Sequence, residues 1–128
     1  MILDTRNGKL TYSIAGHNPP YILDPIKKTA VLLPKGGIAL GLMEPIELKD
    51  VELELRPKQS IVLYTDGLSE STNTNGKEYG QERLQQTLIF LAQKPPEIII
   101  TDLLQDLENF QGGDFFEDDR TLLVLKRN

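Results

Sequence analysis

The sequence has 128 residues, the length of one small domain or of part of a larger one. Hydrophobic residues make up 39% and charged residues 26%, which is enough apolar material for a core and is not the composition of a disordered chain. The 14 basic and 19 acidic residues give a net charge of −5 without any basic run, which argues against binding to nucleic acid or anionic membranes. With no cysteine and one histidine, disulfides, thiolate nucleophiles and cysteine- or histidine-rich metal sites are excluded.

No apolar run approaches the roughly 20 residues of a membrane span. The amino terminus, Met1–Asp4, has no basic stretch followed by an apolar one, so no signal peptide is visible. We therefore expect an intracellular, cytoplasmic protein with no membrane partner and no nucleic-acid partner.

The first 35 residues are predicted to form short strands joined by turns. Asn7-Gly8 is a strong hairpin signal, because both residues tolerate positive φ angles. Two successive prolines at 19 and 20 interrupt the extended pattern, since proline cannot donate to a strand ladder. The expected strands are Met1–Asp4, Lys9–Ala15, Tyr21–Leu23 and Lys28–Leu33. We interpret this region as one antiparallel meander.

A glycine-spaced loop at 36–41 precedes two further strands. Val51–Leu55 alternates apolar and acidic residues, which predicts one buried and one solvated face. Ser60–Tyr64 is almost entirely apolar, which predicts burial on both faces, and it continues directly into Asp66-Gly67.

Helical spacing of apolar residues dominates the second half of the chain. Leucines at 84, 88 and 91 predict a helix over Gln81–Gln93. A second helix begins at Pro95-Pro96 and ends at Gly112-Gly113. An acidic loop then leads to a closing strand, Thr121–Leu125. The order of elements predicts an α+β fold with a mostly antiparallel sheet.

Asp66 and an acidic cluster are the candidate metal ligands. A carboxylate at the mouth of a buried strand is held rigidly, although an Asx-turn that simply ends the strand is the more frequent role of Asp-Gly. Mutual repulsion in an acidic loop can be relieved by Mg²⁺ or Mn²⁺, although most acidic runs are solvated loops. This cluster contains Asp114, Glu117, Asp118 and Asp119.

His17 is the only histidine, in a Gly-His-Asn-Pro-Pro corner. It is a candidate general acid or phosphate ligand. The competing interpretation, a histidine that bonds only its own loop, is the more common one.

Five segments, in order, resemble the motifs of one family, the bacterial PPM-type (PP2C-like) serine/threonine phosphatases of the SpoIIE and RsbU group. The matches cover almost the whole chain, and they are specific as a set rather than singly. The alternative is an unrelated α+β domain with accidental matches. The segments are Leu10–Pro20, Gly36–Gly41, Leu63–Glu70, Gly76–Leu84 and Asp118–Thr121.

The resemblance implies a β-sandwich flanked by helices and the hydrolysis of phosphoserine or phosphothreonine by a water that two Mn²⁺ or Mg²⁺ ions activate. It implies that Asp66 and Asp118 ligate one metal. Gly67 would supply the close backbone turn, and Asp119 would be a neighbour in the second coordination shell. It also places His17 facing the cleft, as a possible catalytic residue.

The family's amino-terminal half contains an Asp-x-x-Gly-His-Gly-like segment and an upstream acidic ligand that this sequence lacks. We therefore expect residues 1–128 to form the carboxy-terminal part of a sandwich that is incomplete on its amino-terminal side, inactive alone and with an uncovered apolar sheet face. The implied partners are a phosphorylated anti-anti-sigma-like protein and an upstream sensor or receiver domain. The alternative function is a degenerate module without catalysis, which binds a partner or forms a homodimer through the exposed sheet.

Overall fold

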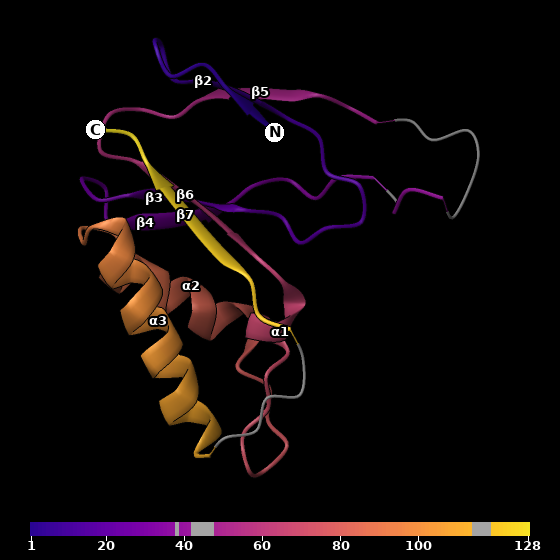
Figure 1. The fold of residues 1–128 in the computed structure, drawn as a ribbon, viewed down its shortest axis with the longest axis vertical. Helices are drawn as coiled ribbons and strands as arrows, with labels where there is room; N and C mark the ends of the chain where they lie inside the picture. The colour runs from indigo at the N-terminus through magenta and orange to yellow at the C-terminus, as the bar shows by residue number, and fades with distance from the viewer. Residues whose placement is uncertain (38, 42–47, 114–118) are drawn as a thin grey trace.

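The computed structural model describes residues 1–37, 39–41, 48–113 and 119–128, and it contains two antiparallel sheets and three helices (Figure 1). The three-stranded sheet has the order β1-β2-β5, with bounds β1 (Ile2–Leu3), β2 (Lys9–Tyr12) and β5 (Val51–Glu54). The four-stranded sheet has the order β4-β3-β6-β7, with bounds β3 (Tyr21–Asp24), β4 (Thr29–Leu32), β6 (Ser60–Tyr64) and β7 (Leu122–Lys126). The helices are α1 (Asp66–Ser69), α2 (Gly80–Leu91) and α3 (Pro96–Gln111).

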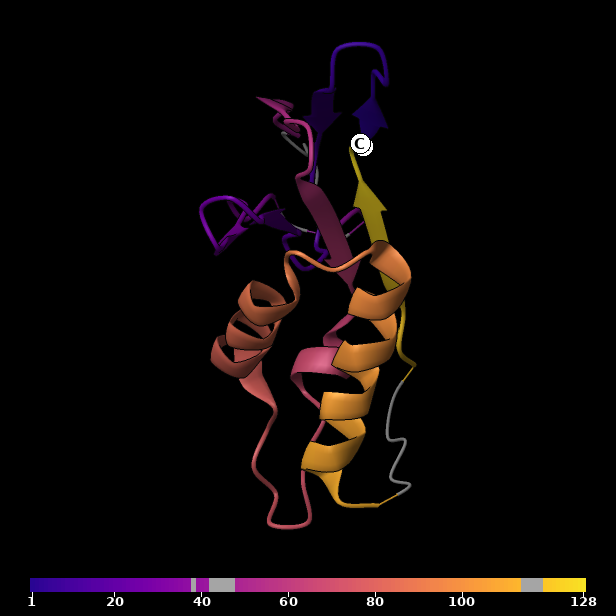
Figure 2. The ribbon, with the colours of Figure 1, turned by 90° about the vertical axis from the view of Figure 1, so that its left-hand side faces the viewer.

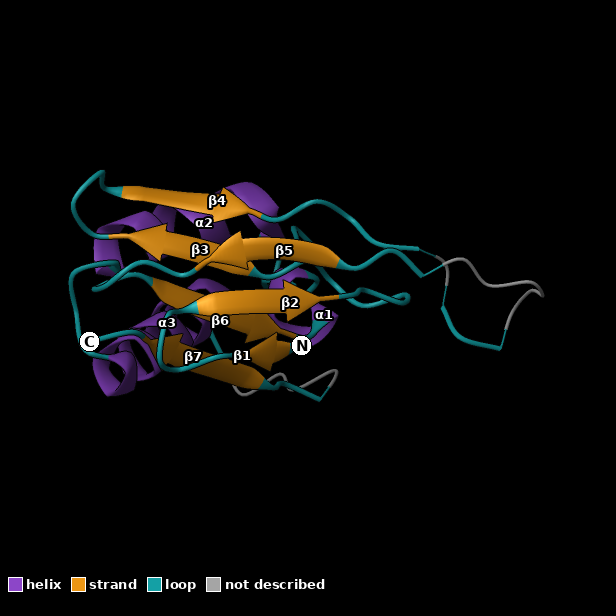
Figure 3. Cartoon of the chain, turned by 90° about the horizontal axis from the view of Figure 1, so that it is seen from above, coloured by secondary structure: helices purple, strands orange, loops and turns teal. Residues whose placement is uncertain are grey.

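These elements stack as three layers. The three-stranded sheet lies over one face of the four-stranded sheet, and α2 and α3 cover the opposite face (Figures 1 and 3). One apolar cluster fills the space between the two sheets, and a larger one lies between the four-stranded sheet and the helices. The predicted α+β fold with a mostly antiparallel sandwich is confirmed, with the described helices on one side of it.

Strand β6 is the central element of the sandwich, because it pairs with β3 on one side and β7 on the other. Its side chains alternate between the two apolar clusters: Ile61 contributes to the inter-sheet cluster, whereas Val62 and Tyr64 contribute to the cluster under the helices. The predicted burial of β6 on both faces is confirmed. This burial fixes the end of the strand, where Asp66 follows.

The two long helices begin and end close to where the sequence predicts. Pro96 stands at the start of α3, where its missing N–H costs nothing, and Gly112 ends the helix in the left-handed conformation at φ 71°. Their buried residues recur at helical spacing and pack on the four-stranded sheet. These residues are Leu84, Leu88, Leu91, Ile99, Leu103 and Leu107. None of the described helices combines the length and apolar composition needed to cross a bilayer.

The predicted single meander over the first 35 residues is wrong. The hairpin of β1 and β2 belongs to the three-stranded sheet, whereas β3 and β4 belong to the four-stranded sheet. The chain changes sheets between Ser13 and Pro20, where two prolines remove ladder donors and Gly16 adopts a φ of 73°. The predicted strand Lys9–Ala15 therefore ends at Tyr12.

Part of the four-stranded sheet is uncovered at β7, as the sequence predicts. Leu123 and Leu125 lie opposite Leu63 and Ile61, so they share the face that packs on the other sheet. Nevertheless, Leu123 is 52% exposed and Leu125 is 39% exposed. β7 is also an edge strand of its sheet, and β1 is an edge strand of the other sheet. The two edges lie on the same side of the sandwich (Figure 3).

Candidate functional site

Asp66 stands where β6 gives way to α1. The preceding Tyr64 is buried and stacks on Tyr21 with ring centroids 5.8 Å apart, which anchors the strand end. The Asp66 side chain is exposed, and no cation among the described residues forms an ion pair with it. The Gly67 N–H donates to Asp66 Oδ1 at 3.0 Å. The main chain at Asp66 is therefore anchored by the buried strand end, and its carboxylate is exposed to solvent.

Thr65 joins the end of β6 to the start of β7. Its hydroxyl donates to the Asp119 carbonyl oxygen at 3.1 Å and accepts from the Thr121 N–H at 2.9 Å. Its own N–H donates to the Thr121 carbonyl oxygen at 3.1 Å. Residues 54 positions apart in the sequence therefore lie side by side, because β6 and β7 pair in antiparallel register up to this point. Thr65 was not predicted as a site residue, although it precedes Asp66 within the segment Leu63–Glu70 that resembles a family motif.

Gly67 makes the closest approach between these two segments. A Cβ atom at this position would lie 2.5 Å from the Asp119 carbonyl oxygen and 3.2 Å from its carbonyl carbon. Because both are main-chain atoms, they cannot rotate away, so the packing requires glycine. The close approach expected of Gly67 is thus with the main chain of Asp119.

The other predicted ligand, Asp118, lies outside the described residues, as do Asp114 and Glu117. Asp119 is described and exposed. Among the described residues, no three carboxylate or histidine side chains are grouped so as to hold a metal ion. The roles of Asp66, Asp118 and Asp119 at a metal therefore stay predictions.

A second contact joins Arg120, which lies just before β7, to the end of α3. The Arg120 guanidinium donates from Nη2 to Gln111 Oε1 at 2.7 Å, and Gln111 is a buried residue in the last turn of α3. The start of β7 is therefore attached both to the end of β6 and to the end of α3.

His17 is an exposed residue in the connection between β2 and β3. The preceding residues are fixed, because Ala15 and Gly37 form a parallel bridge and the Gly16 N–H donates to the Gly37 carbonyl oxygen at 3.1 Å. Within the described part of the chain, His17 itself has no hydrogen bond or ion pair that would join it to Asp66. Its catalytic role stays a prediction.

A cavity of about 620 Å³ lies away from Asp66, beside α2 and α3. Its lining includes Tyr79, Arg83 and Asp106 and contains neither Asp66 nor Asp119. An open pocket between helices does not by itself identify an active site. We therefore place the candidate site at the paired ends of β6 and β7.

Known proteins match this chain over all or nearly all of its length. The family model of stage II sporulation protein E (SpoIIE) matches residues 1–128. The protein IcfG of Synechocystis is 31% identical over 130 residues, and the phosphoserine phosphatase RsbU of Bacillus subtilis is 30% identical over 122 residues. These alignments include 99% and 93% of this chain but only 20% and 35% of the two relatives, so the chain spans a minor part of each.

A solved structure shows the same fold. The SiaA-PP2C domain of Pseudomonas aeruginosa superposes with a TM-score of 0.81 at 23% identity, covering 96% of this chain and 48% of that one. The layered arrangement of the two sheets and the helices is thus that of a PP2C domain. Because the family model extends over all residues and the motifs follow the family order, the chain belongs to the SpoIIE family of PP2C-like proteins.

Proposed function

We propose that the chain is part of a metal-dependent protein phosphatase that hydrolyses phosphoserine or phosphothreonine on a signalling protein. One observation carries the proposal: Thr65 and Gly67 hold the segment that bears Asp66 against the main chain of Asp119. A relative of this chain is a phosphoserine phosphatase, which supports the reaction class. In this proposal Asp66 and Asp118 are the metal ligands, and Gly67 and Asp119 support them.

The residues at this place fit a hard divalent cation. Mn²⁺ and Mg²⁺ prefer oxygen donors, and Asp66 offers a carboxylate that no described cation neutralises. Two such ions, when bound, would activate a water and stabilise charge on the phosphoryl oxygens. The buried end of β6 fixes the position of Asp66. Because Gly67 has no side chain, the main chain of Asp119 can lie close to it. His17 is the proposed additional catalytic residue.

We further propose that the remaining ligands, including a bridging aspartate, come from an amino-terminal part of the domain. On this view residues 1–128 are a partial phosphatase domain and are inactive alone. The proposed substrate is a phosphorylated protein of the anti-anti-sigma type, and the proposed regulator is an upstream sensor or receiver domain. The short share of each relative that the chain covers is consistent with a larger protein.

Metal binding by the isolated chain should be weak. Two carboxylates without a bridging aspartate cannot hold two ions tightly, because each ion would keep most of its coordination shell as water. Calorimetric titration of the 128-residue chain with Mn²⁺ should show weak binding that Asp66→Asn weakens further. Tight binding of two ions per chain would contradict the proposal that the remaining metal ligands lie in an amino-terminal part of the domain.

A second candidate function is association through the exposed face of β7. Leu123 and Leu125 are exposed apolar residues on the last strand of the sheet, where unpaired main-chain groups can also pair with another strand. In this case the chain is a binding or dimerisation module without catalysis.

Self-association is tested by light scattering after size-exclusion chromatography. If β7 forms the contact, the wild-type chain elutes as a dimer, and Leu123→Lys converts it to a monomer because a buried lysine would be unpaired. Ile26→Lys is the matched control, since Ile26 is also exposed but lies in the turn between β3 and β4. A wild-type monomer at high concentration would contradict the dimer.

A further inference from the structure

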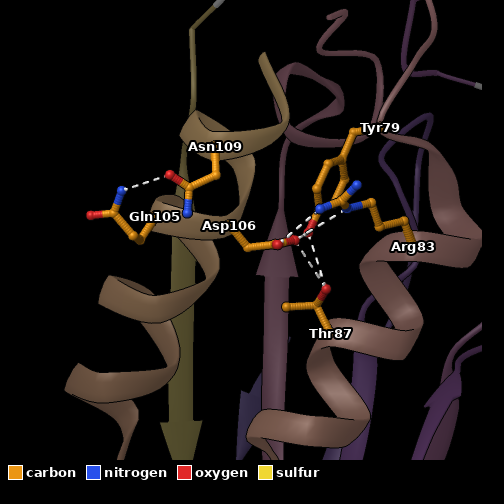
Figure 4. A network of polar contacts seen from close by, with 6 residues as sticks. All are labelled: Tyr79, Arg83, Thr87, Gln105, Asp106 and Asn109. Atoms are coloured by element: carbon orange, nitrogen blue, oxygen red, sulfur yellow. Dashed lines mark hydrogen bonds and ion pairs between the residues drawn. The ribbon is translucent and has the colours of Figure 1, made fainter. Parts of the chain in front are cut away.

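The carboxylate of Asp106 on α3 binds the side chain of Tyr79, which immediately precedes α2, and those of Arg83 and Thr87 on α2 (Figure 4). Its Oδ2 atom accepts from the Tyr79 hydroxyl at 2.6 Å, from Arg83 Nε at 3.2 Å and from Thr87 Oγ1 at 3.3 Å. Its Oδ1 atom accepts from Arg83 Nη2 at 2.9 Å. Asp106 is therefore the common acceptor of a network that joins the two helices.

Tyr79 is the most buried of the three residues that donate to Asp106. Tyr79 is 3% exposed, and burial is the main reason why its pKa is raised to about 12. The neighbouring Arg83 lowers the pKa of Asp106, and its guanidinium lies 5.2 Å from the Tyr79 ring centroid and 4.8 Å from that of Phe110. At neutral pH the phenol therefore donates to an ionised carboxylate, which gives a strong charge-assisted hydrogen bond.

The main chain of Tyr79 extends this network toward the candidate site. The Tyr79 N–H donates to the Ser71 carbonyl oxygen at 2.8 Å, and the buried Ser71 hydroxyl donates to the Gly67 carbonyl oxygen at 2.6 Å. Between them, residues 71–79 form a loop whose ends meet, next to α1 (Figures 1 and 2). Hydrogen bonds thus lead from α3 to the residue that follows Asp66.

Helix α1 needs such support. It has four residues, and its first-turn cap, Thr65, makes no side-chain capping bond because its hydroxyl binds the β7 segment. A single helical turn is unstable by itself, since nucleation fixes several residues for one hydrogen bond. The turn therefore persists only through contacts with its surroundings, and the Ser71 bond to Gly67 is one of these.

We propose that Asp106 is a positioning residue: by holding Tyr79 it fixes the loop 71–79 and, through Ser71, the helical turn that carries Asp66. The proposal rests on the proposed function in one respect only, namely that Asp66 is a metal ligand. It assigns a role to the Gly76–Leu84 motif, which the metal site itself does not use. The competing explanation is that Asp106 only attaches α2 to α3.

Amide hydrogen exchange by NMR on the 128-residue chain separates these explanations. The Glu70 N–H, which donates to the Asp66 carbonyl oxygen at 2.8 Å, reports on α1, and the Tyr79 N–H reports on the loop. Tyr79→Phe removes only the hydroxyl, and we expect exchange at both amides to become about tenfold faster. Exchange in the middle of α3, at Leu103, should be unchanged.

Two further variants test the individual links. Ser71→Ala should accelerate exchange at Glu70 while the bond between Tyr79 and Asp106 stays intact. Asp102→Asn is a control for changes on the surface of α3, because it alters an exposed residue one turn before Asp106 that lies outside the described network. It should leave both reporter amides unchanged.

Two results would overturn the proposal. Uniformly faster exchange in α1, α2 and α3 in Tyr79→Phe would mean that the network only stabilises the whole domain. Faster exchange at Tyr79 with an unchanged Glu70 would mean that the loop does not transmit its order to α1.

Neither metal nor substrate is needed for this measurement, so its outcome is independent of the phosphatase proposal. Mn²⁺ added to the same wild-type sample tests the latter, because a bound paramagnetic ion should broaden the Gly67 amide signal. No broadening at millimolar Mn²⁺, where even a weak site is partly occupied, would contradict metal binding by Asp66 in this chain, and the exchange result would be unaffected.

Discussion

Replacing Asp66 by asparagine should abolish phosphoserine hydrolysis in a longer protein that also carries the family's amino-terminal half. Asparagine keeps the size of the side chain but loses the negative charge, and a neutral amide is a poorer ligand for a hard divalent ion. Changes to groups that merely support a metal ligand cost about 10–100-fold, so loss of a ligand should cost about a hundredfold or more. Asp118→Asn should have the same effect if both residues hold one ion.

The fold should survive the Asp66 substitution. The side chain is exposed, and the Gly67 N–H that it accepts is a local contact. Activity is measured as release of phosphate from a phosphoserine peptide, and circular dichroism during heating shows whether the variant is folded. Asp102→Asn serves again as the control and should keep full activity. Full activity in Asp66→Asn would remove it from the metal site.

The sequence predicts those elements whose signals are local. The apolar run of β6 and the leucine spacing of α2 and α3 reflect burial that is repeated within a few residues, so the elements could be assigned without tertiary information. The helical turn α1 was not predicted, because four residues are too few to show a helical period. The assignment of β3 and β4 to a different sheet from β1 and β2 depends on distant partners that no local pattern specifies.

The same distinction applies to the candidate site. Asp66 and Gly67 stand out in the sequence because Asp-Gly follows a buried strand, and the resemblance to a phosphatase motif gives them a role. The contact of Thr65 with residues 119 and 121 depends on the register between β6 and β7, which is fixed by the packing of the whole sheet. The bond between Tyr79 and Asp106 joins residues 27 positions apart and has no periodic signal.

Substituting Gly67 by alanine should destabilise the protein, although helix propensity alone predicts the opposite. Gly67 has no positive φ angle and lies in α1, where alanine is ordinarily favoured by about 1 kcal/mol. The added Cβ, however, would lie 2.5 Å from the Asp119 carbonyl oxygen, so the two chain segments would have to separate. Such overpacking costs typically about 1–3 kcal/mol, and we expect the free energy of unfolding to fall by about that amount.

Urea denaturation measures this free energy, and the Thr121 amide signal shows whether the segment before β7 has moved. That amide donates to Thr65 Oγ1, so displacement of Asp119 should shift its resonance. Gly76→Ala is the control, because Gly76 has a φ of 74° with open space around it and isolates the backbone cost. It should lower stability without shifting the Thr121 signal. If Gly67→Ala stabilises the protein instead, the ends of β6 and β7 are not in close contact, and Asp66 loses the neighbourhood on which its assignment as a metal ligand depends.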